Sequence, residues 1–532
     1  MSQESDAGIA KNPKSSNTLA FLLAMAMFVL VVDTSIMNVS ISAVVEDLDT
    51  TVSAVQSAIS LEALVSAAFI LINSKVGDLI GRKRAYVLGL CGYAIGAIAM
   101  TLTQSIYPVI IFWAIIGGLG ASLLLPAMQS LIHGNFEGVA QKKAYALVGA
   151  AAAIAAAVGP LLGGFITTYL SWRVAFFLEF VIIVIVLVNI KLIKEAPYTG
   201  SREIDLVGAI LSVFGMSGIV ISILLWEEGG EYVGLLMVMG ALVMFLFARW
   251  LVRAKKQGKP VLLDPDLFKS IYFRLGITAQ TLQNMALGGM MIALPIYFQM
   301  VFEYNAMQTG LAIAPFSLSM FVVAIMAGRR AGKRRASRII QAGFAIMLFG
   351  LILLIPLIPR ADSGLGFSIP LLIIGAGLGL LVSQLNNYTL SPISEERVSE
   401  AAGVNSAGGS FGLSFGLAFT GAIMLATLAL TFTNMAYSST VLSPDQQAQV
   451  AQALEEDAQV MSDTQLQEQL SGQPEEIQEE ILRINTDARY LALQVAMLLP
   501  LIVGLLGLIS SFRMVRLPEP EPVSSTEGMV MG

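Results

Sequence analysis

The sequence predicts an all-α polytopic membrane protein with fourteen transmembrane helices. The 532-residue chain is 56% hydrophobic and only 13% charged, and its mean hydropathy is +0.76. This composition lies outside the range of soluble globular proteins. Apolar runs of about 18 or more residues, each long enough to cross a ~30 Å hydrocarbon core as a helix, recur along the whole chain. The lysines and arginines gather in alternate gaps between these runs.

The predicted spans cover residues 18–42, 54–74, 85–103, 108–130, 144–166, 172–192, 206–226, 232–252, 274–300, 308–328, 338–359, 367–390, 404–431 and 490–512. Of the 31 Lys and Arg residues, 27 fall on one side of these spans, and four (Arg173, Arg360, Arg483 and Arg489) fall on the other. Basic loops mark the cytoplasmic side, so we expect a multi-pass protein of the cell membrane with both termini in the cytoplasm. The first run is too long for a cleaved signal peptide, so we expect it to remain in the mature protein.

The first span contains a single charged residue, Asp33. A carboxylate at the membrane centre costs about 2.5–3.5 kcal/mol on insertion scales, so it usually faces other helices or a water-filled cavity. Glu62 in the second span and Glu179 in the sixth are the other embedded acids, and the predicted topology places all three ~10–14 Å below the outer surface. We expect this acidic layer to bind protons and substrate. In the alternative interpretation, Asp33 is a structural acceptor for Thr34, Asn38 or a neighbouring helix.

The loop between the second and third spans reads SKVGDLIGRKR over residues 74–84. It places Asp78 at the end of one helix and Arg82 and Lys83 at the start of the next, with Gly81 in the turn between them. These charges either form a latch at the cytoplasmic face or are ordinary positive-inside flanking residues.

The fifth span contains GAAAAIAAAVGPLLGGFI over residues 149–166. Its small residues let helices approach closely, and Pro160 removes a backbone donor. Gly159, Gly163 and Gly164 flank this proline. The segment therefore predicts either a bend near the outer end of the span or a tightly packed helix interface without moving parts.

The ninth span carries three amides on one helix face, Gln280, Gln283 and Asn284. They either line a substrate cavity opposite Asp33 or join helices by hydrogen bonds. The lone histidine, His133, is interpreted as a solvated interfacial side chain rather than a proton relay.

The segment 432–489 leaves the membrane on the outer side and carries eleven acids against two arginines. Ser443 and Pro444, with Gln446 three residues after the serine, form a helix-start signal. The segment is therefore either a small helical cap or a solvated, partly disordered loop.

Five segments together resemble the major facilitator superfamily: DTSIMNVSI at 33–41, GDLIGRKR at 77–84, GPLLGG at 159–164 with SWR at 171–173, LPIYFQMVFEYNAMQTGLAIAP at 294–315, and EAAGVNSAGGSFGLSFGLAFTGAI at 400–423. Fourteen spans point to its drug:proton antiporter branch. The resemblance implies the major facilitator fold, with six-helix bundles at 18–194 and 257–513, an extra helix pair at 195–256, and cytoplasmic tails at 1–17 and 514–532.

The resemblance also assigns residues to motifs. Asp33 and Asn38 match the first-helix motif; Asp78, Gly81, Arg82 and Lys83 match the cytoplasmic gate motif; Gly159, Pro160, Gly163 and Gly164 match the antiporter motif.

The chain departs from the family pattern at several positions. The loop motif has Ser74 in place of a glycine and Leu79 in place of an arginine, and the fourth-helix motif has Ala114 where the family carries a membrane-embedded arginine associated with proton coupling. Glu62 stands where an aromatic residue is usual, and Glu179 where asparagine is usual. We therefore expect either proton movement through carboxylates alone or a different mode of coupling.

The sequence contains no phosphate-binding loop, metal-ligand cluster or nucleophile–base set, and its only cysteine, Cys91, lies in an apolar run. We therefore expect no enzyme activity, cofactor, metal or nucleic-acid partner, and an ion gradient as the energy source. The predicted function is alternating-access export of small amphipathic, cationic or neutral compounds in exchange for protons, by a monomer in the lipid bilayer. The alternatives are an exporter of lipids or lipid-like metabolites, and a non-transporting receptor or scaffold that binds through its outer segment.

Overall fold

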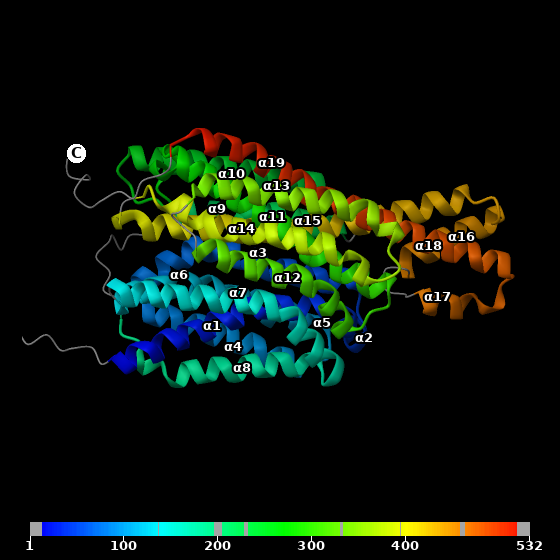
Figure 1. Ribbon diagram of the computed structural model, residues 1–532, viewed down its shortest axis with the longest axis horizontal. Coiled ribbons are helices and arrows are strands. Elements are labelled where there is room, and N and C mark those ends of the chain that lie inside the picture. The colour runs from blue at the N-terminus through cyan, green and yellow to red at the C-terminus, as the bar shows by residue number, and fades with distance from the viewer. Residues whose placement is uncertain are drawn as a thin grey trace, which may run out of the picture.

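The computed structural model describes residues 13–136, 138–195, 205–227, 232–329, 334–393, 395–457 and 463–518. In these ranges the regular elements are helices, and the long ones run side by side along the longest axis of the molecule (Figure 1). Twelve helices in this part of the chain are long and apolar enough to cross a membrane. The predicted all-α membrane architecture is therefore confirmed.

Two predicted spans are not among those twelve. The first coincides with α8 (Trp172–Val188), which has only 17 residues. The second coincides with α9 (Leu206–Glu227), which has 22 residues but whose apolar stretch is counted only over Leu206–Ile219. The number of fourteen crossings therefore stays a prediction.

The first helices of the chain pack against one another as a group. They are α1 (Pro13–Val39), α3 (Val52–Ile80), α4 (Arg82–Leu102), α6 (Gly118–Asn135), α7 (Gly138–Tyr169) and α8. Glycines let the backbones of α4 and α6 approach closely, because a Cβ atom on Gly120 would lie 2.7 Å from the carbonyl oxygen of Gly89.

A second group follows later in the chain: α11 (Ile271–Val301), α12 (Ala306–Arg329), α13 (Ala336–Leu357), α14 (Ser368–Leu390), α15 (Glu395–Ser438) and α19 (Leu498–Arg516). Two helix pairs make most of the contacts between the groups: α7 packs on α12, and α3 packs on α15. The interface between the groups is therefore built mainly from α3 and α7 on one side and α12 and α15 on the other.

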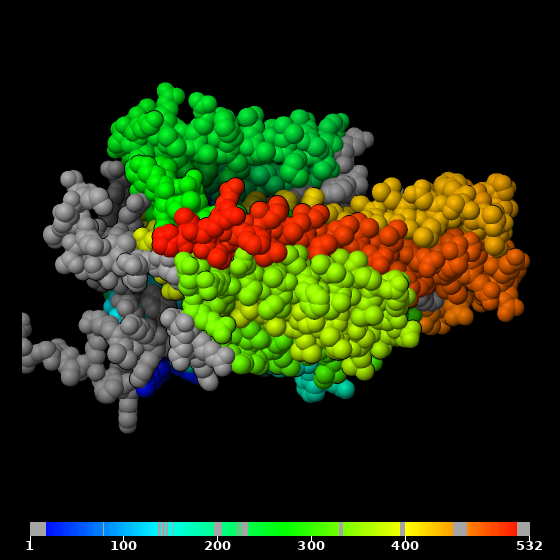
Figure 2. Space-filling view, turned by 45° about the horizontal axis from the view of Figure 1, so that its top comes forward, coloured from blue at the N-terminus to red at the C-terminus, as the bar shows by residue number. Residues whose placement is uncertain are grey.

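The helices α9 and α10 (Val233–Lys256) pack on each other as a hairpin. On its inner side α9 contacts α3 and α15, where Met216 packs against Ala67 and Ala68. The apolar stretch of α10 is only 17% buried, and Figure 2 shows this green helix along one edge of the molecule. The hairpin thus covers the seam between α3 and α15 and leaves α10 largely uncovered.

One end of the molecule carries four further helices: α2 (Ile41–Leu48), α16 (Pro444–Asp457), α17 (Asp463–Gln469) and α18 (Glu475–Ala496). We call it the outer end, because the charge distribution predicts it to lie outside the cytoplasm. The helices α16, α17 and α18 project beyond the bundle there (Figure 1). The predicted helix start is confirmed: α16 begins at Pro444, and the backbone N–H and hydroxyl of Ser443 donate to the side-chain oxygen of Gln446 at 3.0 and 2.9 Å.

Several element boundaries differ from the predicted spans. The fourth span begins with a short helix, α5 (Ile106–Pro108), and a π-helix, η1 (Val109–Gly117), before α6. The last span falls on α18 and α19, which are separate helices on either side of Met497. Hydropathy marks where a segment is apolar, whereas backbone hydrogen bonds decide where a helix starts, widens or ends, so the two criteria diverge at these points.

Candidate functional site

Asp33 is completely buried on α1. Its carboxylate accepts a hydrogen bond from the hydroxyl of Tyr93 on α4. The indole N–H of Trp113, on the π-helix η1, lies 3.0 Å from each of its two oxygens. An indole donates but cannot accept, so Trp113 acts only as a donor here. The described bonding partners of Asp33 are therefore neutral donors.

The other two embedded acids lie close to Asp33. Glu62 on α3 and Glu179 on α8 are 7% and 3% exposed, and each interacts electrostatically with Asp33. Tyr93 lies within electrostatic range of all three carboxyl groups. Neither carboxyl oxygen of Glu179 has a hydrogen-bonding partner in the described part of the chain. The three acids therefore form one buried cluster around Tyr93, which we call the acidic cluster.

The π-helix η1 carries Trp113 into this cluster. A π-helix has one more residue per hydrogen-bonded turn than an α-helix, and such segments often occur at functional sites. The next residue, Ala114, is fully buried. A Cβ atom on Gly118 would lie 2.8 Å from the carbonyl oxygen of Glu62, so a glycine at this position lets α3 approach the fourth span. Trp113 therefore contacts Asp33 from the position directly before Ala114. The family resemblance places an arginine at the position of Ala114.

Aromatic side chains connect the acidic cluster with the outer end. Trp113 packs edge-on against Phe176 with ring centroids 6.3 Å apart, and Phe176 packs in the same way on Trp172 at 6.0 Å. The indole N–H of Trp172 donates to Asp47 at 2.9 Å, and Asp47 also pairs with Arg173. Packing thus couples the surroundings of Asp33 to an ion pair at the outer end.

Asn38 lies five residues after Asp33 on α1 and is completely buried. Both polar atoms of its amide lack a hydrogen-bonding partner among the described residues. Asn38 lines a cavity of about 10 Å³ together with Pro160 of α7 and Met290 of α11, so the cavity lies between the two helix groups. A cavity of this size is near the lower limit for one water molecule, and Asn38 and Ser35 are the polar residues in a lining that is otherwise apolar.

Gln56 on α3 was not among the predicted site residues, although it is fully buried with both amide atoms unpartnered in the described part. Tyr93 and Trp113 were also missed. In the sequence, each of the three is a side chain with a polar group inside an apolar span, and this could have marked it as a candidate. The sequence does not reveal which neighbouring residue such a side chain contacts.

Polar contacts join the two helix groups at the outer end. The backbone N–H and hydroxyl of Ser42 donate to the side-chain oxygen of Gln299 at 2.9 and 2.6 Å, and the amide N–H of Gln299 donates to the carbonyl of Val39 at 3.0 Å. The backbone N–H of Met307 donates to Thr168 at 3.0 Å. These contacts close the outer side of the interface between the groups.

The GPLLGG segment packs α7 against two helices. A Cβ atom on Gly159 would lie 2.6 Å from the Cβ of Ser35, and one on Gly163 would lie 2.9 Å from the Cα of Ile36, both on α1. Gly164 faces the second group instead, where its Cβ would lie 2.8 Å from the Cα of Met307. The helix α7 continues through Pro160, so these residues provide close packing within an unbroken helix.

The loop of the cytoplasmic gate motif contacts the end of the first helix group. Gly81 has a φ of +101°, a conformation that favours glycine, and the backbone N–H of Lys83 donates to Glu195 at 3.0 Å. Arg82 is buried and donates to the carbonyl of Ser74 at 3.4 Å. The side chain of Asp78 lies outside the described residues, as does that of His133.

The three amides of α11 lie together. Gln280 donates to Gln283 at 3.3 Å, and Asn284 donates to the carbonyl of Gln280 at 3.1 Å. A Cβ atom on Gly409 of α15 would lie 3.1 Å from the Asn284 amide nitrogen. These amides therefore contact one another and α15, and the hydrogen bonds described for them do not extend to Asp33.

Comparison with known proteins gives one matching family. Residues 23–417 match the profile of the Major Facilitator Superfamily. The multidrug resistance protein Stp of Mycobacterium tuberculosis is 26% identical over 76% of this chain and 75% of its own. The puromycin resistance protein pur8 of Streptomyces alboniger is 28% identical over 77% of this chain and 82% of its own.

A solved structure has the same fold. It is a bacterial homolog of the human lysosomal transporter Spinster in an inward-facing, unoccupied conformation, with a TM-score of 0.61. It is 11% identical to this chain and covers 95% of this chain and 99% of its own.

Proposed function

Because this chain belongs to the major facilitator superfamily, and is thus a transporter rather than an enzyme, we propose that it exports small amphipathic compounds in exchange for protons by alternating access. The relatives named for resistance to puromycin and to multiple drugs support export of such compounds. We further propose that it works as a monomer in the cell membrane with both termini in the cytoplasm.

The acidic cluster is the observation that carries this proposal. Two buried carboxyl groups, Glu62 and Glu179, each interact with that of Asp33, and the bonding partners described for Asp33 are neutral. A buried charge without a counter-ion is unfavourable, and either a bound proton or a bound cation relieves it. Proton and cationic cargo therefore compete for the same groups, which is the requirement for exchange. A site with acids and no bases favours cationic or neutral cargo over anions.

The second part of the mechanism is the closed outer side. The contacts of Ser42 and Met307 hold the helix groups together there. In alternating access these contacts break when the outer side opens, so that cargo bound near Asn38 and Asp33 leaves outward while protons enter.

The test is export of a cationic dye in everted membrane vesicles with an imposed proton gradient. We expect Asp33→Asn to abolish export while the protein stays folded in the membrane. Glu46→Gln, which removes an exposed acid at the outer end, is the control and should export normally. Full export by Asp33→Asn, or equal loss in both variants, would reject the acidic cluster as the exchange site.

A further inference from the structure

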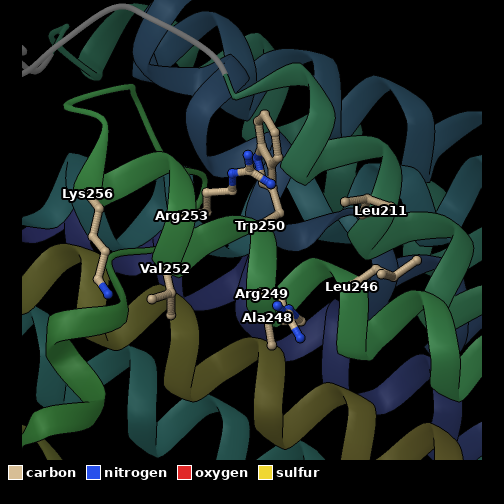
Figure 3. Close-up of a pocket in the computed structure, with 8 residues that line it drawn as sticks. All are labelled: Leu211, Leu246, Ala248, Arg249, Trp250, Val252, Arg253 and Lys256. Atoms are coloured by element: carbon tan, nitrogen blue, oxygen red, sulfur yellow. The ribbon is translucent and has the colours of Figure 1, made fainter.

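The hairpin of α9 and α10 carries a groove of about 860 Å³ on its exposed side (Figure 3). Arg249, Arg253 and Lys256 of α10 line it, together with apolar side chains that include Leu211 of α9 and Leu246 of α10. The groove is far along the chain from Asp33, and none of its lining residues belongs to the acidic cluster. It therefore requires a separate explanation.

The three cations share one face of the helix. Arg249 and Arg253 are four residues apart and Lys256 follows three residues later, a spacing that places neighbouring side chains on the same side. All three are exposed, and none has a carboxylate partner in the described part of the chain. The face therefore presents a concentrated positive charge.

The nearby acids are already bound elsewhere. Lys255, on another side of α10, pairs with Asp264 and, at 2.6 Å, with Asp266. Hydrogen bonds from Lys255 and Lys269 lower the pKa of Asp266 to about 2, so this carboxylate remains charged and paired. These pairs do not neutralise Arg249, Arg253 or Lys256.

The carboxylate of Asp205 is also occupied, and it gives the groove a fixed wall. It accepts hydrogen bonds from the Trp250 indole N–H at 2.9 Å, from the backbone N–H of Gly208 at 2.8 Å and from that of Leu262 at 3.1 Å. Trp250 itself lines the groove. The tryptophan ring is therefore held in place between the start of α9 and the loop after α10.

The cations lie at the end of α10, and the apolar surface extends from there toward the middle of the helix. Toward the middle of α10, Leu246 and Leu242 are 45% and 54% exposed, and the cations lie in its last two turns. A ligand that matches this surface has an anionic head and an apolar body. A free anion would pair with the cations but leave the apolar part of the groove uncovered. A phospholipid covers both parts, and a helix in a bilayer already has lipid beside it.

We propose that this groove binds an anionic phospholipid, with Arg249, Arg253 and Lys256 at its phosphate headgroup and the leucine side chains against its acyl chains. Basic pockets between helices on the cytoplasmic side of a membrane have the charge and depth that such headgroups require. The charge distribution of the chain predicts that the groove lies on that side. The proposal does not depend on what the protein transports.

Native mass spectrometry of the detergent-solubilised full chain tests this with two probes, dioleoylphosphatidylglycerol and dioleoylphosphatidylcholine. We expect the first phosphatidylglycerol to bind at least about tenfold more tightly than phosphatidylcholine, since each basic residue contributes about 1 kcal/mol toward anionic lipid. In the variant R249Q/R253Q/K256Q this preference should disappear. Thermal unfolding of the variant without added lipid verifies that it is folded.

The control variant R338Q/R513Q/R516Q removes three exposed cations at the ends of other helices on the same side of the molecule. It should keep the preference for phosphatidylglycerol. Equal loss in both variants, or an unchanged preference in R249Q/R253Q/K256Q, overturns the site. Displacement of the lipid by millimolar inorganic phosphate alone also overturns it, since the groove would then be an anion site without selectivity for lipid.

Discussion

The indole nitrogen of Trp113 lies 3.0 Å from both carboxylate oxygens of Asp33. This contact comes from the fourth span, one residue before Ala114, where the family resemblance places an arginine. A neutral donor stabilises a carboxylate by a directed hydrogen bond but does not cancel its charge. The negative charge of the cluster therefore remains available to a proton or to a cation.

We predict that Trp113→Phe, which removes the N–H and keeps an aromatic ring, reduces proton-driven export about tenfold or more. A hydrogen bond to a charged group contributes about 1.5–3 kcal/mol, and about 1.4 kcal/mol corresponds to a factor of ten. Initial rates of dye export in everted vesicles measure the effect. Phe112→Leu, at the neighbouring exposed position, is the matched control. Normal export by Trp113→Phe would show that this hydrogen bond has no part in exchange.

We predict that Glu179→Gln lowers export of a cationic compound and leaves export of a neutral one largely intact. Both carboxyl oxygens of Glu179 lack described partners, so an amide of the same shape removes charge without breaking a described hydrogen bond. Thermal unfolding should accordingly be unchanged or slightly higher, because an unpaired buried charge is unfavourable. Equal loss for both compounds contradicts a role in charge selection.

A cross-link at the outer end should stop transport. Ser42 and Gln299 contact each other across the two helix groups, so a cysteine pair at these positions joins them when a short bifunctional thiol reagent is added. The native chain has one cysteine, Cys91, and Cys91→Ser provides the background. The reagent has a linker that a reductant cleaves. We expect export to cease after cross-linking and to return when the linker is cleaved. Each single-cysteine variant serves as control, and undiminished export by the cross-linked protein rules out opening at this point.

Gly164→Val should disturb the same interface by overpacking. The new side chain meets the start of α12, where even a Cβ atom lies 2.8 Å from the Cα of Met307. Overpacking of this kind typically costs about 1–3 kcal/mol, so we expect a lower midpoint of thermal unfolding and slower export. Gly149→Val, on the same helix, is the control, because a Cβ atom there has no neighbour within 4 Å. Equal destabilisation by both variants contradicts the assignment of close packing to Gly164.

The resemblance to a known family rested on short segments in order along the chain, and the match over residues 23–417 confirms it. For the GPLLGG segment, the sequence allowed either a bend or close packing. The glycines can be recognised in the sequence, but their structural role depends on the helices that they contact. The structure places Gly159 and Gly163 against α1 and Gly164 against α12 within one continuous helix.

The amino-acid sequence by itself determined the membrane class, the apolar helices and the presence of embedded acids, because hydropathy and charge act on each segment separately. Tertiary structure decided which groups meet. The donors to Asp33 are 60 and 80 positions away, and Gln299 contacts Ser42 from 257 positions away. Such contacts depend on how helices rotate and cross when they pack, and the apolar pattern of a buried helix, which has several similar faces, does not specify that rotation.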